Sequence, residues 1–381
     1  MDDHDGGRES LAPERRAAIR AVRACVIVAA LGAFAASGAS AAQDPFADLI
    51  GSGTSGRFAQ EDEQVSKKTG ETRAYEIRYA KWQPATPNGK VIVYNHGFQS
   101  HQGWFYATAN EFAGQGYAVY AFDRIGSGES SGGMAVDDGE VVEVRGHVRD
   151  WKLFLESVDL MLDLAAEENP GAELILWGNS YGAKVVTAYL YERADRPDVR
   201  TISAAVLTTP GNYRDKDGMP LPFSRIKLVT SGGLKRFPVP MVERDGDNGA
   251  SWFVAPGPWF DRIRDDELSL REVTRTYYME TNQLDKATNG RSKRTKLGVP
   301  AFYLMVRDDV MMNNDKMQKD IEEHASDSVF KYYSGGSENK HFLLFTEDRE
   351  EAIADILAFL DGRLEKIEGA QRVGEGSSYN D

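Results

Sequence analysis

The sequence of 381 residues contains a single cysteine, Cys25, and only six histidines. One thiol cannot form an intramolecular disulfide, so a chain of this length must rely on its buried core for stability. Positive charge is scarce too, because 45 lysines and arginines stand against 59 acidic residues and leave a net charge of −14. Such an acidic surface repels phosphate backbones and makes nucleic acid a poor partner.

Long apolar runs are nearly absent as well. The one exception, residues 24–36 (ACVIVAALGAFAA), follows a basic stretch from Arg15 to Arg23 and is shorter than the ~20 residues that cross a bilayer. The sequence A-S-A at residues 39–41 fits a signal-peptidase cleavage site. Residues 1–41 are therefore predicted to be a secretory signal peptide, and the mature chain is predicted to be exported, periplasmic or secreted, without a membrane span. A retained membrane anchor is the alternative.

Short apolar segments alternate with amphipathic helical patterns through most of the chain. The clearest helix runs from Val148 to Ala166, where apolar residues recur at i, i+4, i+7 and i+11. Strands are predicted at residues 73–80, 90–94, 117–122, 172–177, 203–208, 301–306 and 328–333. Strands that alternate with helices are typical of an α/β protein with a mostly parallel, doubly wound sheet.

One connection breaks this alternation. Residues 211–298 separate two predicted strands, whereas α/β connections usually have only ~2–6 residues. A folded cap, or lid, is predicted there. Its aromatic residues are predicted to cover a substrate pocket. Four of them are predicted to bind the substrate: Trp252, Phe253, Trp259 and Phe260. The alternative is that these side chains form the core of the cap itself.

The other boundaries follow from changes in composition. A polar, Gly/Ser-rich stretch precedes the first predicted strand, and a charged, Gly/Ser-rich stretch follows the last predicted helix. The assignment is a lead-in segment at residues 42–70, a core at 71–210 and 299–364, and a disordered tail at 365–381.

The sequence Gly178-Asn179-Ser180-Tyr181-Gly182 carries the clearest chemical signal. It matches G-x-S-x-G between a predicted strand and a predicted helix, where a sharp turn exposes the serine hydroxyl as a nucleophile. The backbone N–H of Tyr181, at a helix N-terminus, is a candidate donor to an oxyanion. A second match at residues 128–132 lies in a Gly-rich loop without a strand or helix beside it, and a turn is predicted there.

A nucleophilic serine needs a base and a carboxylate that orients the base. His341 lies in a Gly/Ser/Asn loop after the last predicted strand, at the edge where parallel strands end and where chemistry collects in α/β sheets. It is the predicted base. Asp308 and Asp309 follow the strand at 301–306, and either could orient the imidazole from its position alone.

The remaining part of such a site is an oxyanion hole. Gly97 follows the strand at 90–94, and the next amide, that of Phe98, is predicted to be the second donor. His96 and His101 could instead ligate a metal. The chain has neither an H-E-x-x-H sequence nor an acidic cluster near them, so no metal and no cofactor are predicted.

Taken together, these motifs resemble the α/β-hydrolase superfamily, and within it the monoacylglycerol lipase and lysophospholipase-like branch. The resemblance covers residues 72–364. It rests on the stretches HGFQSH (96–101), AFDRIGSGESSG (121–132), WGNSYGAK (177–184), GVPAFYLMVRDDVMMN (298–313) and KHFLLFTEDRE (340–350). In this branch the acid lies three residues after a strand-end glycine. Val306 takes that glycine position here, so the resemblance selects Asp309.

Some positions depart from the branch. Asn179 and Tyr181 replace the commoner His and Met beside the nucleophile, Ser127 replaces a frequent His, and the cap is the least similar part. The motifs and the resemblance imply a serine hydrolase that cleaves carboxylic esters through an acyl-enzyme, with monoacylglycerol- or lysophospholipid-like small molecules or lipids as substrates. The signal-like segment adds the expectation that this hydrolase is exported. The alternatives are a peptidase or C–C bond hydrolase on the same scaffold, and a non-catalytic binding protein.

Overall fold

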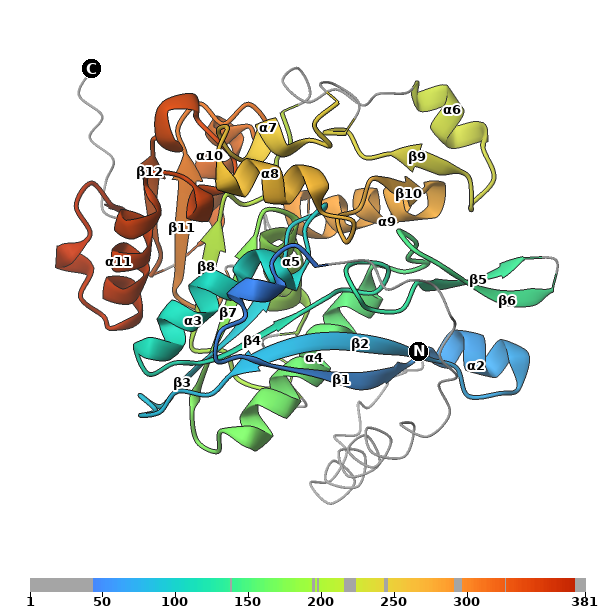
Figure 1. Ribbon diagram of the computed structural model, residues 1–381, viewed down its shortest axis with the longest axis horizontal. Helices are drawn as coiled ribbons and strands as arrows, with labels where there is room; N and C mark the ends of the chain where they lie inside the picture. The colour runs from blue at the N-terminus through green and yellow to red at the C-terminus, as the bar shows by residue number, and fades with distance from the viewer. Residues whose placement is uncertain are drawn as a thin grey trace, which may run out of the picture.

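Nine strands form the central sheet in the described part of the chain. The computed structural model describes residues 44–373, except residues 138, 194–195, 197–198, 216–223, 243–245, 291–296 and 326. Their order is β1-β2-β4-β3-β7-β8-β11-β12-β13 (Figure 1). From β4 to β12 every neighbouring pair is parallel, whereas β1, β2 and β13 run antiparallel to their neighbours. The bounds are β1 (Thr54–Glu61), β2 (Ala74–Trp82), β3 (Lys90–Asn95), β4 (Ala118–Phe122), β7 (Glu173–Asn179), β8 (Ala204–Thr208), β11 (Ala301–Val306), β12 (Val329–Tyr333) and β13 (Gln371–Arg372).

The central strands form because their side chains are apolar on both faces. Every residue of β4 and β11 is buried, as expected for parallel strands covered by helices on both sides. All the strands predicted from the sequence are present, as β2, β3, β4, β7, β8, β11 and β12. The predicted α/β fold with a mostly parallel sheet is therefore confirmed.

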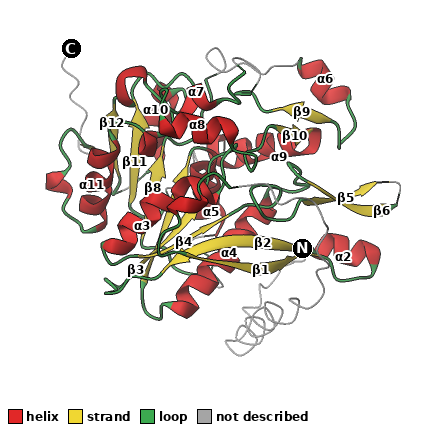
Figure 2. Cartoon of the chain, viewed as in Figure 1, coloured by secondary structure: helices red, strands yellow, loops and turns green. Residues whose placement is uncertain are grey.

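Helices flank this sheet (Figure 2). The apolar stripe of α4 is buried along its length, as predicted, although the helix begins at Lys152 and not at Val148. The flanking helices are α3 (Tyr106–Gly114), α4 (Lys152–Glu168), α5 (Tyr181–Arg193), α10 (Asn314–His324) and α11 (Arg349–Leu360), with short 3₁₀ turns at η2 (Ala47–Leu49), η3 (Gln102–Phe105), η6 (Gly336–Glu338), η7 (Leu343–Phe345) and η8 (Leu364–Lys366). In the described part of the chain, each helix is too short or too polar to span a bilayer.

The long connection between β8 and β11 folds into small elements that lie together above the sheet, coloured yellow and orange in Figure 1. They are α6 (Arg225–Thr230), β9 (Arg236–Pro238), α7 (Ala250–Phe253), α8 (Pro258–Asp265), β10 (Glu272–Thr274), α9 (Arg275–Asp285) and a π-helical turn at Lys286–Gly290. We call these elements the cap. A separate hairpin of β5 (Gly133–Asp137) and β6 (Glu140–Val144) precedes α4.

The structure differs from the predicted boundaries in two segments, the lead-in and the C-terminal tail. The predicted lead-in at 42–70 contributes β1 and α2 (Glu63–Thr69), because β1 pairs along its whole length with β2 and extends the core sheet. The predicted disorder of 365–381 is wrong for residues 365–373, because β13 pairs with β12 at the opposite edge. The polar composition of both edge strands hid them in the sequence. The predicted signal peptide and residues 374–381 lie outside the described residues.

Candidate active site

Ser180 occupies the sharp turn between β7 and α5. Its φ of +52° is a left-handed conformation that non-glycine residues rarely adopt. The glycines on either side are needed for close approach: a Cβ at Gly182 would lie 2.0 Å from the carbonyl oxygen of Asn95, and one at Gly178 would lie 2.5 Å from the Cα of Ala183. This is the strained strand-to-helix turn that G-x-S-x-G permits.

Gly182→Ala is expected to destabilise the protein by about 1–3 kcal/mol or more, because the new methyl group would overlap the Asn95 carbonyl. Gly114→Ala is the control. Gly114 ends α3 and a Cβ there meets nothing within 4 Å, so alanine should be neutral or stabilise by up to ~1 kcal/mol. Urea unfolding measures both, and equal stability of the two variants would contradict the steric argument.

The structure brings Ser180, His341 and Asp309 together. Nε2 of His341 lies 2.8 Å from Oγ of Ser180, and Nδ1 lies 2.6 Å from Oδ2 of Asp309. The three side chains are buried, with exposures of 8%, 1% and 5% in the order serine, histidine, aspartate. A buried carboxylate at this distance fixes both the orientation and the tautomer of the imidazole, leaving Nε2 free to accept the serine proton.

The geometry separates the two candidate acids. Oδ1 of Asp309 accepts a hydrogen bond from the amide of Met311 at 2.8 Å, which turns Oδ2 toward His341. Asp308 is exposed and has a φ of +56°. Of the two, Asp309 is therefore the one in contact with the imidazole.

The cap holds the loop that carries His341. The amide of His341 donates to the carbonyl of Trp252 at 3.2 Å, and the amide of Phe342 donates to the carbonyl of Phe253 at 3.1 Å. The ring of Phe253 lies 6.2 Å from that of His341 and packs edge-on against Trp104. These two cap residues therefore support the histidine loop directly.

The other two predicted cap aromatics lie elsewhere. The indole of Trp259 stacks on Phe345 with a centroid separation of 4.1 Å and also faces Phe46. Trp259 and Phe345 line a cavity of about 170 Å³ together with Lys340. Phe260 is half-buried against the core.

The predicted oxyanion donors lie beside the serine. A Cβ placed on Gly97 would be 3.6 Å from the Cβ of Ser180, so the loop that carries Phe98 runs close to the nucleophile. The ring of Phe98 packs edge-on against Tyr181, with 5.1 Å between centroids. Within the described chain, neither the Phe98 nor the Tyr181 amide donates to a protein acceptor. Neither predicted donor is therefore engaged by a competing acceptor among the described residues.

Tyr277 and Tyr278 of α9 are among the cap aromatics expected to cover a pocket, although they are not among the four predicted substrate-binding residues. They face the ring of Phe98 from the cap side. Sequence reasoning missed Arg124, which donates to the Gly97 carbonyl in the loop that carries Phe98. Its only signals are its place two residues after a predicted strand and within the stretch AFDRIGSGESSG. No local pattern distinguishes such residues, because the sheet brings them together from distant parts of the chain.

Two of the other histidines have structural partners. Nε2 of His101 lies 3.1 Å from Oδ2 of Asp266, and Nδ1 of His147 lies 2.9 Å from Oγ1 of Thr274. Among the described residues, no group of three His, Cys, Asp or Glu side chains is placed to hold a metal ion.

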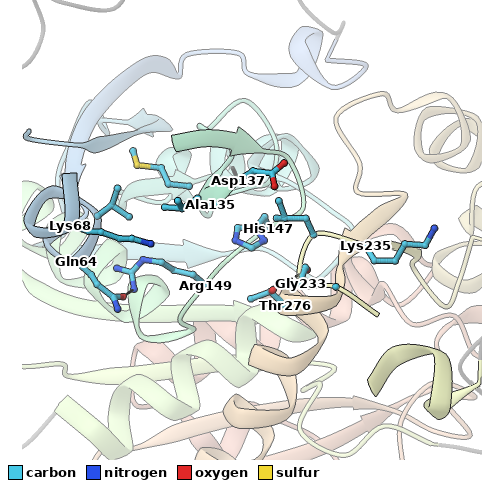
Figure 3. A pocket seen from close by; sticks show the side chains of 14 residues that line it. Gln64, Lys68, Ala135, Asp137, His147, Arg149, Gly233, Lys235 and Thr276 are labelled. Carbon is cyan, nitrogen blue, oxygen red and sulfur yellow. Dashed lines mark hydrogen bonds between the residues drawn. The ribbon is translucent and has the colours of Figure 1, made fainter. Parts of the chain in front are cut away.

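A cavity of about 600 Å³ lies away from Ser180, between α2, β5 and the cap (Figure 3). It is lined on one side by Lys68 and Arg149 and on the other by Gly233 and Lys235, with His147 between them. None of the predicted site residues lines it. Arg149 is already paired with Asp62.

A serine on a strained strand-to-helix turn, with a histidine and an aspartate supplied by loops after later strands of a mostly parallel sheet, defines an α/β-hydrolase. The chain belongs to the serine aminopeptidase (S33) family of these proteins, whose family model matches residues 86–345. The resemblance predicted from the motifs, to the monoacylglycerol-lipase-like branch of the α/β-hydrolases, is confirmed by the relatives.

Two curated relatives are lipases. The monoacylglycerol lipase of Mycolicibacterium smegmatis is 34% identical over 113 residues, which is 30% of this chain and 36% of that protein. Human monoglyceride lipase is 27% identical over 133 residues, 34% of this chain and 39% of that protein. The matched stretch is thus well under half the length of either relative.

Solved structures show the same fold over a larger share of the chain. The monoacylglycerol lipase of Paleococcus ferrophilus has a TM-score of 0.57 at 19% identity, covering 75% of this chain and 99% of that one. A soluble variant of monoglyceride lipase from Saccharomyces cerevisiae, in complex with a substrate analogue, has a TM-score of 0.61 at 15% identity, covering 76% and 92%.

Proposed function

We propose that the protein is a serine hydrolase that cleaves carboxylic esters through an acyl-enzyme. The observation that carries this proposal is the pair of hydrogen bonds from His341, to Ser180 at 2.8 Å and to Asp309 at 2.6 Å. A serine hydroxyl is a poor nucleophile on its own and needs an adjacent base whose orientation is fixed by a third group.

In the first half-reaction, Oγ of Ser180 attacks the ester carbonyl while Nε2 of His341 takes its proton. Asp309 holds the imidazole and stabilises the imidazolium. The amides of Phe98 and Tyr181 donate to the oxyanion of the tetrahedral intermediate. The intermediate collapses as His341 returns the proton to the leaving alcohol. In the second half-reaction, a water molecule attacks the acyl-enzyme with the same proton transfers and releases the carboxylic acid.

A monoacylglycerol- or lysophospholipid-like ester is the proposed substrate. The names of the two curated relatives, a monoacylglycerol lipase and a monoglyceride lipase, support it. Aromatic rings on both sides of the serine support it too, with Phe253 beside His341 and Tyr277 and Tyr278 beside Phe98. Apolar walls with few polar groups suit an acyl chain.

The family description, serine aminopeptidase, favours peptide hydrolysis as a second candidate. A substrate panel distinguishes the two. We expect hydrolysis of monoacylglycerols, lysophospholipids or nitrophenyl esters at rates far above those of aminoacyl anilides and short peptides. Faster cleavage of the amide substrates would make the protein a peptidase. Cleavage of a 1,3-diketone without ester cleavage would make it a C–C bond hydrolase, and inertness towards every substrate would favour a binding protein.

Export is a separate proposal, supported by the signal-like sequence at residues 1–41. Expression of the full chain in a bacterial host should give a periplasmic or secreted form that begins at or near residue 42. An uncleaved chain in the membrane fraction would make the segment an anchor instead.

Activity is expected to fall on acidification, because a protonated imidazole of His341 cannot accept the proton of Ser180. Two other histidines should not contribute to this fall: burial and the charge of Arg124 hold the pKa of His96 well below its usual value, and burial beside Arg149 lowers the pKa of His147 to about 4. The measurement is kcat/KM as a function of pH. A flat profile between about pH 5 and 8 would argue against a histidine base.

If Phe253 forms part of an acyl pocket, kcat/KM should rise as the acyl chain lengthens, by up to ~0.8 kcal/mol or about fourfold per methylene, and then level off. Phe253→Ala should flatten this slope, with little effect on acetate esters. Trp259→Ala is the matched control, because Trp259 packs on Phe345. It should lower the melting temperature without changing the slope. Parallel losses on short and long esters in Phe253→Ala would mean that Phe253 is only part of the cap core.

A further inference from the structure

Arg124 is a buried cation without an acidic partner. It follows β4, its side chain is fully buried, and among the described residues its hydrogen-bond partners are backbone carbonyls and no carboxylate. Burying an unpaired charge is costly unless other groups solvate it. Here those groups are backbone carbonyls: the guanidinium donates through Nη1 to the carbonyl of His96 and through Nη2 to that of Gly97 at 2.6 Å.

His96 contributes a second donor to the same carbonyl. Its Nδ1 lies 2.8 Å from the Gly97 oxygen, and its Nε2 accepts the backbone N–H of Arg124 at 3.1 Å. Since Nε2 accepts, the proton is on Nδ1 and donates to Gly97. The Gly97 carbonyl is therefore held by two donors, one from the guanidinium and one from a neutral imidazole.

The two hydrogen bonds to the Gly97 carbonyl fix the direction of the Phe98 amide. In a trans peptide the C=O and the N–H of one unit point in opposite directions. The carbonyl of the Gly97–Phe98 unit points toward Arg124 and His96, so the N–H of Phe98 points to the opposite side. The unit itself lies against Ser180, because a Cβ on Gly97 would be 3.6 Å from the serine Cβ.

The same guanidinium also touches the residue that carries the other donor. Its central carbon lies 5.1 Å from the centroid of the Tyr181 ring and 5.7 Å from that of Phe154. The ring of Tyr181 in turn packs edge-on against Phe98. Arg124 therefore contacts both sides of the oxyanion hole while staying out of the space that a substrate would occupy.

We propose that Arg124 is a positioning residue of the oxyanion hole, which holds the Gly97–Phe98 peptide so that the Phe98 amide is aimed at the developing oxyanion. The inference rests on the proposed ester hydrolysis. Because positioned donors act mainly on the transition state, loss of Arg124 should lower kcat and leave the binding of the ground state almost unchanged.

The test compares Arg124→Lys and Arg124→Gln with the wild-type protein. Lysine keeps the positive charge but has no planar group that donates to two carbonyls at once. Glutamine keeps a planar donor but has no charge. The probes are an alkyl trifluoromethyl ketone, whose adduct with Ser180 places an oxyanion in the hole, and the matching methyl ketone, which forms no stable adduct. Arg145→Lys is the matched control, because Arg145 also binds two backbone carbonyls. Those carbonyls belong to Gly128 and Leu268, neither of which is part of the triad or of the oxyanion hole.

For at least one Arg124 variant that keeps its fold, we expect kcat to fall about 10²-fold and the trifluoromethyl ketone to bind weaker by a similar factor. KM and the affinity for the methyl ketone should stay within about threefold, and Arg145→Lys should stay within about threefold in every parameter. Trifluoromethyl ketone affinity that stays at the wild-type value in both Arg124 variants would overturn the inference and leave ester hydrolysis intact. A wild-type protein that neither hydrolyses esters nor binds this ketone would overturn the proposed function itself.

Discussion

Replacing Ser180 with alanine is expected to lower kcat for ester hydrolysis by roughly 10⁶-fold, because no other group can form the acyl-enzyme. The hydroxyl lies 2.8 Å from Nε2 of His341, and no other hydroxyl bonds to that nitrogen among the described residues. KM should change far less, since the walls of the site remain. The measurement is steady-state hydrolysis of the best ester from the substrate panel.

Ser130→Ala is the control for this substitution. Ser130 is the central serine of the second G-x-S-x-G sequence, but its hydroxyl donates to the carbonyl of Asp123 and accepts the amide of Arg78. Its loss should cost about 1 kcal/mol of stability and leave kcat within about tenfold of the wild type. If Ser130→Ala abolished turnover and Ser180→Ala kept it, the assignment of the nucleophile would be wrong.

Asp309→Asn should lower kcat by about 10⁴-fold. An amide in place of the carboxylate can present its NH₂ to Nδ1 of His341, which favours the tautomer with the proton on Nε2 and prevents that nitrogen from accepting the serine proton. The carboxylate bond to Nδ1 is 2.6 Å long, so the substitution acts directly on the imidazole. KM and the melting temperature report on the remaining structure.

Asp308→Asn is a matched control because it makes the same chemical change one residue away. Asp308 is exposed, and asparagine tolerates its left-handed φ of +56°. Its kcat should stay within about tenfold of the wild type. A larger loss in Asp308→Asn than in Asp309→Asn would show that the neighbouring aspartate orients the histidine.

Much of the fold could be predicted because it is encoded locally. Buried parallel strands such as β4 and β11 consist of uninterrupted apolar residues, and the stripe on α4 repeats with the helical period. The turn at Ser180 is visible because G-x-S-x-G is a short local sequence between an apolar strand and a helix. The structure then shows why each glycine is needed: a side chain at Gly178 would meet Ala183 of the following helix, and one at Gly182 would meet the Asn95 carbonyl at the end of β3.

What could not be predicted depends on contacts between distant segments. The edge strands β1 and β13 are polar and gain their structure from pairing with β2 and β12. The choice between Asp308 and Asp309 needed a resemblance, because adjacent residues differ only in the direction of their side chains. Arg124 is a charged residue in a loop by sequence, and only the packing of β4 beside β3 carries it under the oxyanion loop.

The most direct test of the account is the mass of the intact protein after rapid mixing with a slowly hydrolysed ester or with a fluorophosphonate. A single covalent adduct is expected on the peptide that contains Ser180 and is expected to be absent from Ser180→Ala. Its mass increase should equal that of the acyl or phosphonyl group less the hydrogen that the group replaces. Hydrolysis of the ester with no adduct at Ser180, or equal labelling of Ser180→Ala, would contradict the acyl-enzyme mechanism.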